Sequence, residues 1–389
     1  MKTYELDNAL GIVLPERIDS NSADTVKEEI QNLFDNKTLD HIFFDASELK
    51  YISSAGLRVI LKFRKDDKEL KIINVCSEVY EIFEMTGFTE ILTIEKSYKQ
   101  MSVDNCEIIG KGAKGTVYRY NSDTVLKVYN DSNCIDSIKN ERNLAKKAFI
   151  LGIPTAISFD LVKVGDKFAT VYELLDADSF SGIMAKHPEK VEECSKMFAD
   201  TISLIHSTKV DTDELPSAKK RYNKAWAVGI KALLDEETFN KVNKMLDEIP
   251  EPNNMLHCDY HTNNVMLQND EPLVIDMDTL SYGHPLYDLG SIYFTYVSQT
   301  KYDSKSAEAF LNLDTNTIEK VWSYFLPQYL KSDDETYIKE VERKIMCFSN
   351  LRFINHLYRR SKDPQNDSVI LEVVKEFKNQ LMDIDSFVW

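Results

Sequence analysis

Hydrophobic and polar positions over the first hundred residues switch repeatedly between the two-residue period of a strand and the 3.6-residue period of a helix. The apolar runs Gly11–Leu14 and His41–Phe44 indicate strands, whereas Val26, Ile30 and Leu33 share one face of a helix. The predicted elements are strands over residues 11–14, 41–44 and 70–75 and helices over residues 20–34, 54–65 and 77–87. Short units of this kind predict a small mixed sheet with helices packed mainly on one side.

A glycine-rich segment begins a second pattern near residue 103. Gly110, Gly112 and Gly115 stand in the spacing G-x-G-x-x-G, and Val117 follows two positions later. A dinucleotide-binding fold requires a helix to begin at the third glycine, but the β-branched and aromatic residues after Gly115 predict a strand. We therefore expect a hairpin whose backbone N–H groups cover the phosphates of ATP.

Lys127 lies in the second strand of this hairpin, and Glu141 follows 14 positions later in a predicted helix. A Lys127–Glu141 pair would direct the lysine toward the α- and β-phosphates. The alternatives are an edge-strand lysine and a solvated helix-face acid. Glu173 and Leu175 end the next apolar strand, where backbone groups of a hinge would meet the adenine.

The segment from His257 to Asp276 carries the main candidate chemistry. Asp259 is followed five positions later by Asn264, and Asp276 ends an apolar strand. Phosphoryl transfer to a hydroxyl group needs a proton acceptor and Mg²⁺ held by oxygen ligands. We interpret Asp259 as the base and Asn264 and Asp276 as Mg²⁺ ligands; taken singly, each could be a loop residue that only forms hydrogen bonds.

His257 and His261 lie four positions apart and suggest a metal pair. No helix is expected around Asp259 and no third soft ligand is nearby, so we interpret both histidines as braces of the loop.

Composition limits the remaining functions. The 389 residues suggest two or three domains, and a net charge of −17 disfavours a partner that is nucleic acid or an anionic membrane. The six cysteines form no C-x-x-C pair, which favours reduced thiols. No signal peptide or membrane span is evident, so we expect a cytoplasmic protein.

The first hundred residues resemble the STAS domain of bacterial anti-sigma factor antagonists, through Tyr51–Leu57 and Phe83–Phe88. The resemblance implies a protein partner and makes Ser54 a candidate phosphorylation site, because the aligned serine of that family can be phosphorylated. At the position before this serine, where the family usually has an acidic residue, this chain has Ser53. The simpler alternative is that Ser53 or Ser54 only caps a helix.

Residues 103 to about 300 resemble the aminoglycoside phosphotransferase and choline kinase group. The stretch His257–Asn264 matches the group's motif except at Cys258, Thr262 and Asn263, where Gly, Pro and Gly are usual. In that group, the aspartate that corresponds to Asp288 is a structural brace. We therefore expect a multidomain α/β and α+β chain: a STAS-like β/α domain over residues 1–98, then a bilobal protein-kinase-like fold with a β-rich N-lobe (103–176) and a helical C-lobe (177–389).

Only eleven residues separate Asp276 from Asp288, fewer than an activation segment that holds a peptide requires. The predicted function is thus an ATP-dependent kinase with a small-molecule hydroxyl acceptor, similar to an aminoglycoside, choline or a sugar. Acids and aromatics after residue 310, including Glu319, Glu342 and Trp322, could receive a cation or simply form a solvated face over a packed core. Two further alternatives are a Ser/Thr protein kinase acting on STAS-type proteins and a nucleotide-sensing scaffold.

Overall fold

The computed structural model describes residues 1–6, 9–35, 41–112, 114–132, 134–175 and 177–389. Residue 113 of the glycine motif and residue 176 at the predicted lobe boundary lie outside these ranges. The chain divides into two compact units, one formed by residues 1–118, 126–132 and 160–171 and the other by residues 119–125, 133–159 and 172–389.

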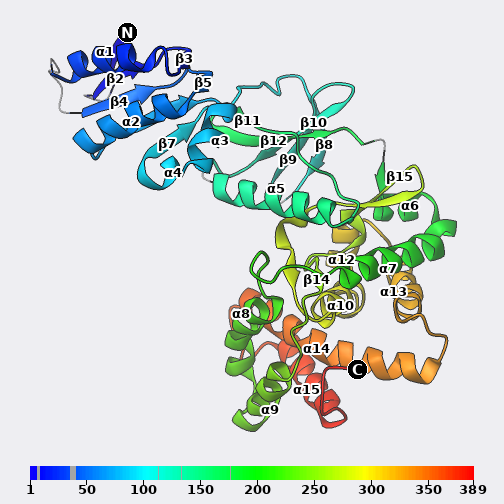
Figure 1. Cartoon of the computed structure of the whole chain (residues 1–389). Helices are drawn as coiled ribbons and strands as arrows, with labels where there is room; N and C mark the ends of the chain where they lie inside the picture. Colours follow the sequence, from blue (N-terminus) through cyan, green and yellow to red (C-terminus); the bar gives the residue numbers. More distant parts are fainter. Residues whose placement is uncertain (7–8, 36–40, 113, 133, 176) are drawn as a thin grey trace. The chain divides into compact units, whose positions relative to one another are not determined.

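The first unit begins with a five-stranded sheet in the order β1-β2-β4-β6-β7. β1 and β2 pair antiparallel, while β2, β4, β6 and β7 run parallel to one another. The strands are β1 Thr3–Leu6, β2 Ala9–Val13, β4 His41–Asp45, β6 Lys71–Val75 and β7 Thr93–Lys96. Parallel neighbours require crossover connections, which here contain α1 Ala23–Asp35, α2 Ser54–Asp66, and α3 Ser77–Met85 with α4 Phe88–Ile91 (Figure 1). The predicted mixed β/α domain is confirmed, although β1 and β7 were not expected.

Helix α2 begins as its sequence requires. A short parallel pair, β3 Arg17–Ile18 and β5 Tyr51–Ile52, leads into it. Ser53 adopts an extended conformation, and its side chain accepts a hydrogen bond from the Ala55 N–H at 3.2 Å. Of the two serines, Ser53 is therefore the N-cap, and Ser54 is the exposed first residue of the helix.

A second sheet has the order β11-β12-β10-β9-β8. Its strands are β8 Glu107–Lys111, β9 Gly115–Arg119, β10 Thr124–Tyr129, β11 Asp160–Val164 and β12 Lys167–Glu173. The buried residues Leu126, Val128, Val162 and Ala169 form its core. Hydrogen bonds join Lys163 of β11 to Lys99 and Met101, so the polar stretch between the two sheets runs along the edge of the second one.

The second unit is mostly helical. It contains a three-stranded sheet, β13-β15-β16, and the short pair β14-β17. The strands are β13 Asp178–Ser179, β14 Met255–Leu256, β15 Val265–Gln268, β16 Glu271–Val274 and β17 Ser281–Tyr282. The α-helices are α5 Ile135–Ile150, α6 Phe180–Lys186, α7 Val191–Ser207, α8 Ala218–Leu233, α9 Glu236–Asp247, α10 Leu286–Tyr293, α11 Gln299–Tyr302, α12 Ser304–Leu311, α13 Thr315–Leu330, α14 Glu335–Arg360 and α15 Ser368–Met382. Shorter helical turns are η1 Pro188–Lys190, η2 Thr262–Asn264, η3 Met277–Thr279 and the π-type turn η4 Phe294–Ser298.

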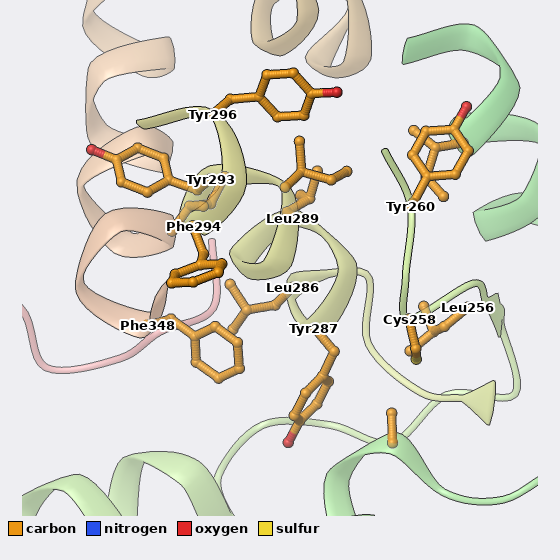
Figure 2. Packing of buried hydrophobic residues seen from close by; sticks show 14 of the residues in the cluster. Leu256, Cys258, Tyr260, Leu286, Tyr287, Leu289, Tyr293, Phe294, Tyr296 and Phe348 are labelled. Carbon is orange, nitrogen blue, oxygen red and sulfur yellow. The ribbon is translucent and has the colours of Figure 1, made fainter. Parts of the chain in front are cut away.

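Aromatic packing sets the distance between helices in this unit. Figure 2 shows Tyr287 and Phe348, whose rings meet edge to face at 5.3 Å between centroids and join α10 to α14. A Cβ atom placed on Gly290 would lie 2.6 Å from the Phe348 ring, so the absence of a side chain allows this close approach. The contact matters for function because α10 and α14 both border the cavity described below.

No helix among the described residues is long and apolar enough to cross a bilayer.

The glycine hairpin yields a stability prediction. A Cβ atom on Gly115 would lie 2.4 Å from the Val128 carbonyl oxygen, whereas one on Gly110 would come no nearer than 3.6 Å to Val117. We expect Gly115→Ala to destabilise the second sheet by about 1–3 kcal/mol, because backbone atoms cannot move aside as a flexible side chain can. Hydrogen exchange of the β9 and β10 amides should accelerate in Gly115→Ala and stay near wild type in Gly110→Ala. Equal exchange in both variants would contradict the close approach.

Candidate active site

Asp259 lies in the loop between β14 and η2, with its side chain 46% exposed. Its backbone N–H donates to Nδ1 of His257 at 3.3 Å, and its carbonyl oxygen accepts from Nδ2 of the buried Asn264 at 3.0 Å. The backbone is therefore held from both sides while the carboxylate stays accessible. A group that must receive a proton from a bound hydroxyl needs both properties.

The β15–β16 hairpin brings Asn264 and Asp276 to the same end of the sheet. Val265 stands opposite Val274, the last residue of β16, and Ile275, which follows this strand, donates its N–H to the Asn264 carbonyl oxygen at 2.9 Å. Because Nδ2 of Asn264 is engaged by Asp259, its Oδ1 remains as the atom that a cation would use.

Three carboxylates gather beside this hairpin. Buried Glu141 of α5, Asp276 and Asp278 each offer an oxygen atom, and these atoms lie within 4.8 Å of one another. Like charges at this spacing repel unless a positive charge is close by. A set of hard oxygen donors is what Mg²⁺ prefers, so the residues fit that ion. Asp278 was not predicted as a ligand from the sequence, although its position two residues after Asp276 was a usable signal.

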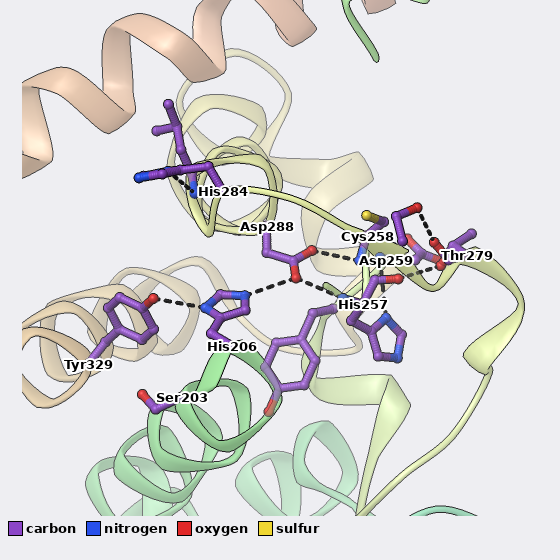
Figure 3. Close-up of polar contacts among 12 residues, drawn as sticks. Ser203, His206, His257, Cys258, Asp259, Thr279, His284, Asp288 and Tyr329 are labelled. Carbon is purple, nitrogen blue, oxygen red and sulfur yellow. Dashed lines mark hydrogen bonds and ion pairs between the residues drawn. The ribbon is translucent and has the colours of Figure 1, made fainter. Parts of the chain in front are cut away.

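Buried Asp288 organises the loop that carries Asp259 (Figure 3). Its Oδ2 accepts from the His257 N–H at 2.8 Å and its Oδ1 from the Cys258 N–H at 2.6 Å. Nε2 of His206 lies 3.0 Å from Oδ2, and the other ring nitrogen of His206 contacts the Tyr329 hydroxyl at 2.8 Å. Burial by itself raises the pKa of the Asp288 carboxyl, but the hydrogen bond from His206 and the contacts with His257 outweigh burial, so this pKa lies below its usual value.

Hydrogen bonds brace the loop near the positions where the aminoglycoside phosphotransferase and choline kinase group usually has Gly, Pro and Gly. Cys258 has a left-handed backbone with φ of 66°, a conformation that favours glycine. The Thr262 N–H donates to the Tyr296 hydroxyl at 2.9 Å. Asn263 donates from Nδ2 to the Phe310 carbonyl oxygen at 2.7 Å. These contacts hold the loop in place of proline.

Of the two loop histidines, His257 forms hydrogen bonds of the kind expected of a brace, whereas Nδ1 of His261 has no hydrogen-bond partner among the described residues. Nε2 of His257 is 3.3 Å from the Ile275 carbonyl oxygen while its Nδ1 accepts from Asp259. His261 is buried, which lowers its pKa to about 4 against the opposing effect of the Asp259 charge. His261 is therefore neutral at pH 7, with Nε2 4.0 Å from the Asp259 carboxylate.

The predicted nucleotide residues divide between the two units. In the first unit, Gly112 donates its N–H to the Gly115 carbonyl oxygen at 2.9 Å, in the turn between β8 and β9. Gly110 lies in β8 and half-buried Val117 in β9. The segment is thus a strand–turn–strand unit, and no helix begins at Gly115.

Lys127 is half-buried in β10, with Nζ 5.3 Å from the centroid of the Tyr129 ring. Lys127 belongs to the first unit and Glu141 to the second, so their pairing stays a prediction. Glu173 ends β12 and Leu175 follows it. The intervening Leu174 donates its N–H to the Asp123 carbonyl oxygen at 2.8 Å, and the adenine hinge also stays a prediction.

A cavity of about 370 Å³ adjoins Asp259. The acids and aromatics after residue 310 that could have received a cation do not line it. Trp322 and Phe325 are buried in the helical core, and Trp322 donates from Nε1 to Glu342 at 2.7 Å. This arrangement agrees with the alternative stated for that set, a solvated face over a packed core.

Comparisons with known proteins match two separate stretches of the chain. The family model "Phosphotransferase enzyme family" matches residues 105–321, and the STAS domain model matches residues 1–101. The putative anti-sigma factor antagonist BtrV of Bordetella bronchiseptica is 32% identical over 97 residues, which cover 24% of this chain and 83% of that protein.

Two solved structures are also similar. Aminoglycoside phosphotransferase APH(2'')-Ib with bound ADP is 15% identical, with 80% of this chain and 98% of that one covered and a TM-score of 0.44. The gentamicin complex of APH(2'')-IIa is likewise 15% identical, with coverages of 81% and 99% and a TM-score of 0.43.

The buried carboxylate gives a pH-dependent stability prediction. We expect Asp288→Asn to destabilise the second unit by about 3 kcal/mol at pH 7, because an amide cannot accept hydrogen bonds on both sides. Since the folded-state pKa of Asp288 is lowered, its contribution is present above about pH 4 and is lost as the pH falls through the folded value. The difference in free energy of unfolding between Asp288→Asn and wild type should therefore become smaller at acidic pH.

Urea denaturation followed by tryptophan fluorescence measures this difference in free energy of unfolding, since Trp226, Trp322 and Trp389 all lie in the second unit. Asp367→Asn is the matched control, because asparagine caps α15 about as well as aspartate does. An Asp288→Asn stability equal to wild type at pH 7 would remove Asp288 from its bracing role.

Proposed function

The chain belongs to the phosphotransferase enzyme family and carries an N-terminal STAS domain, and we propose that it transfers the γ-phosphoryl group of ATP to a hydroxyl group of a small molecule. The main support is the geometry around Asp259: an accessible carboxylate on a backbone that is fixed by His257 and Asn264. Through its hydrogen bond to the Asp259 carbonyl oxygen, Asn264 links the backbone of this residue to the hairpin end where Asp276 lies.

In the proposed reaction, the acceptor hydroxyl binds beside Asp259 and its oxygen attacks the γ-phosphorus. The proton of that hydroxyl passes to the Asp259 carboxylate as the new P–O bond forms. The bond between the γ-phosphorus and the β,γ-bridging oxygen breaks, and ADP leaves with that oxygen. Asp259 later releases the proton to solvent.

Asn264, Asp276 and Asp278 are the residues that would hold Mg²⁺, and Glu141 would supply the third carboxylate oxygen beside the ion. The bound ion would neutralise charge on the phosphates. The glycine hairpin and Lys127 would contact those phosphates, as would be expected of a kinase N-lobe. Val117, Glu173 and Leu175 would contact the adenine.

The STAS domain would serve as a binding module for a protein partner. Ser54 is exposed at the first position of α2, where the helix dipole and free N–H groups favour an added phosphate. The segment between Asp276 and Asp288 contains only η3, β17 and the start of α10, which supports a small acceptor over a protein substrate.

Asp259→Asn tests the base. We expect its ADP release with an accepted hydroxyl compound to fall by about 10²–10⁴-fold, the usual contribution of general base catalysis. Its ATP affinity should stay near wild type. Asp270→Asn, in the exposed β15–β16 turn, is the matched control and should keep full activity. Undiminished turnover in Asp259→Asn would exclude the assigned base.

The metal set has its own test. Asp276→Asn and Asp278→Asn should each shift to higher concentration the Mg²⁺ dependence with which a fluorescent ATP analogue binds, because each removes one charged oxygen donor. We expect a shift of roughly tenfold or more for Asp276→Asn and a smaller one for Asp278→Asn. A Mg²⁺ dependence unchanged in both variants would place the metal elsewhere.

A further inference from the structure

The cavity beside Asp259 has an unusual charge for so acidic a protein. It is lined by the Asp259 loop, by residues from α10 and η4, and by the C-terminal part of α14. Among the described residues that line it, Asp259 supplies the only carboxylate, whereas Arg352 and Arg360 supply two guanidinium groups. The net charge of the whole chain is −17, so this cationic wall is not a consequence of composition.

Helical spacing explains why these groups converge. Arg352, His356 and Arg360 lie four residues apart on α14, so their side chains project from one face of the helix. The ring of Phe348 on α14 packs against Gly290 on α10. This close contact between the two helices holds that part of α14 beside the Asp259 loop. The basic face is therefore part of a packed structure rather than of a loose surface.

Contacts with neutral groups hold both guanidinium groups in place. Arg352 donates from Nη1 to the Ser291 hydroxyl and lies with Cζ 5.1 Å from the centroid of the Phe294 ring. Nη1 of Arg360 is 3.1 Å from Nε2 of His356.

Burial, together with the charges of Arg360 and Arg352, lowers the pKa of His356. His356 is therefore neutral at pH 7, and its Nε2 can accept the hydrogen bond from Arg360.

Within the described ranges of the chain, neither Arg352 nor Arg360 forms an ion pair with a carboxylate. Hydrogen bonds from Ser306 lower the pKa of Asp303, the exposed N-cap of α12, and the charge of Arg360 adds a smaller effect in the same direction. Two positive charges thus border a cavity with donors still available, which is the arrangement that binds carboxylate or phosphate oxygens.

The rest of the lining suits a hydroxylated compound. Ser291, Thr295, Gln299 and Ser306 contribute neutral hydroxyl and amide groups, which pair with sugar-like or polyol hydroxyls. The volume of about 370 Å³ is near the lower end for ligand sites, consistent with a compact acceptor.

We propose that the phosphate acceptor is a small polyhydroxy compound bearing an anionic group, a carboxylate or a phosphate ester, which Arg352 and Arg360 bind beside the hydroxyl that Asp259 deprotonates. This proposal rests on the proposed function and narrows its substrate class. A cationic amino sugar would instead bring its ammonium groups against two fixed positive charges, at a cost in binding free energy.

The test compares acceptors that share a skeleton and differ in charge. ADP release is measured with glycerol, glycerate, glycerol 3-phosphate and 2-amino-1,3-propanediol, and with glucose, gluconate, glucose 6-phosphate and glucosamine. We expect the anionic members to have kcat/KM values at least about tenfold above the neutral and cationic ones. Comparing carboxylates with phosphate esters shows which anionic group fits better.

Arg352→Gln and Arg360→Gln then locate the binding. Each should raise the acceptor KM by about 10- to 100-fold, as expected for loss of hydrogen bonds to a charged group, with the KM for ATP unchanged. Arg343→Gln, an exposed arginine elsewhere on α14, is the matched control and should behave as wild type.

The outcomes separate this inference from the proposed function. Turnover of neutral or cationic compounds in preference to anionic ones, abolished by Asp259→Asn, would overturn the inference and leave the proposed function intact. Arginine variants that raise the KM for ATP alone would assign these groups to the nucleotide and also overturn it. ADP release from none of the compounds, together with no Mg²⁺-dependent binding of an ATP analogue, would reject both.

Discussion

The candidate site depends on one buried carboxylate that accepts hydrogen bonds from two adjacent backbone N–H groups. Asp288 fixes His257 and Cys258, and these residues set the direction in which the chain enters the Asp259 loop. A buried charge is stable only when its hydrogen bonds are satisfied, and His206 completes the set for Asp288. The loop can therefore hold Cys258 in a left-handed conformation that an unbraced cysteine would avoid.

A second constraint comes from carboxylates held close together. The hairpin places Asp276 near Asn264, and η3 returns the chain so that Asp278 faces the same group as Glu141. Their mutual repulsion opposes folding unless positive charge compensates it. Asp288 and this group of three carboxylates thus differ in effect. Asp288 fixes the backbone of the Asp259 loop, whereas the three carboxylates concentrate negative charge at one place.

Local patterns in the sequence were enough to predict β2, β4, β6, α1, α2 and α3 of the STAS domain, the glycine hairpin and the strand that precedes Asp276. The edge strands β1 and β7 were not predicted, because short exposed strands carry little periodic signal. Asp278 was missed although it lies two residues after Asp276, since its place beside the other carboxylates depends on the turn at η3. Arg352 and Arg360 could not have been assigned, because their place beside Asp259 results from the packing of α14 on α10, far away in the sequence.

In the function that we propose, the Asp259 loop presents the base, the group formed by Glu141, Asp276 and Asp278 would attract a divalent cation, and the cationic wall would select the acceptor. The most direct test is a crystal structure of the full chain with Mg²⁺ and a non-hydrolysable ATP analogue. The account predicts a metal ion bound by Asp276 and the γ-phosphate, with the Asp259 carboxylate facing the γ-phosphorus across a space for one hydroxyl group. A nucleotide whose γ-phosphate lies away from Asp259 and Asp276 would contradict it.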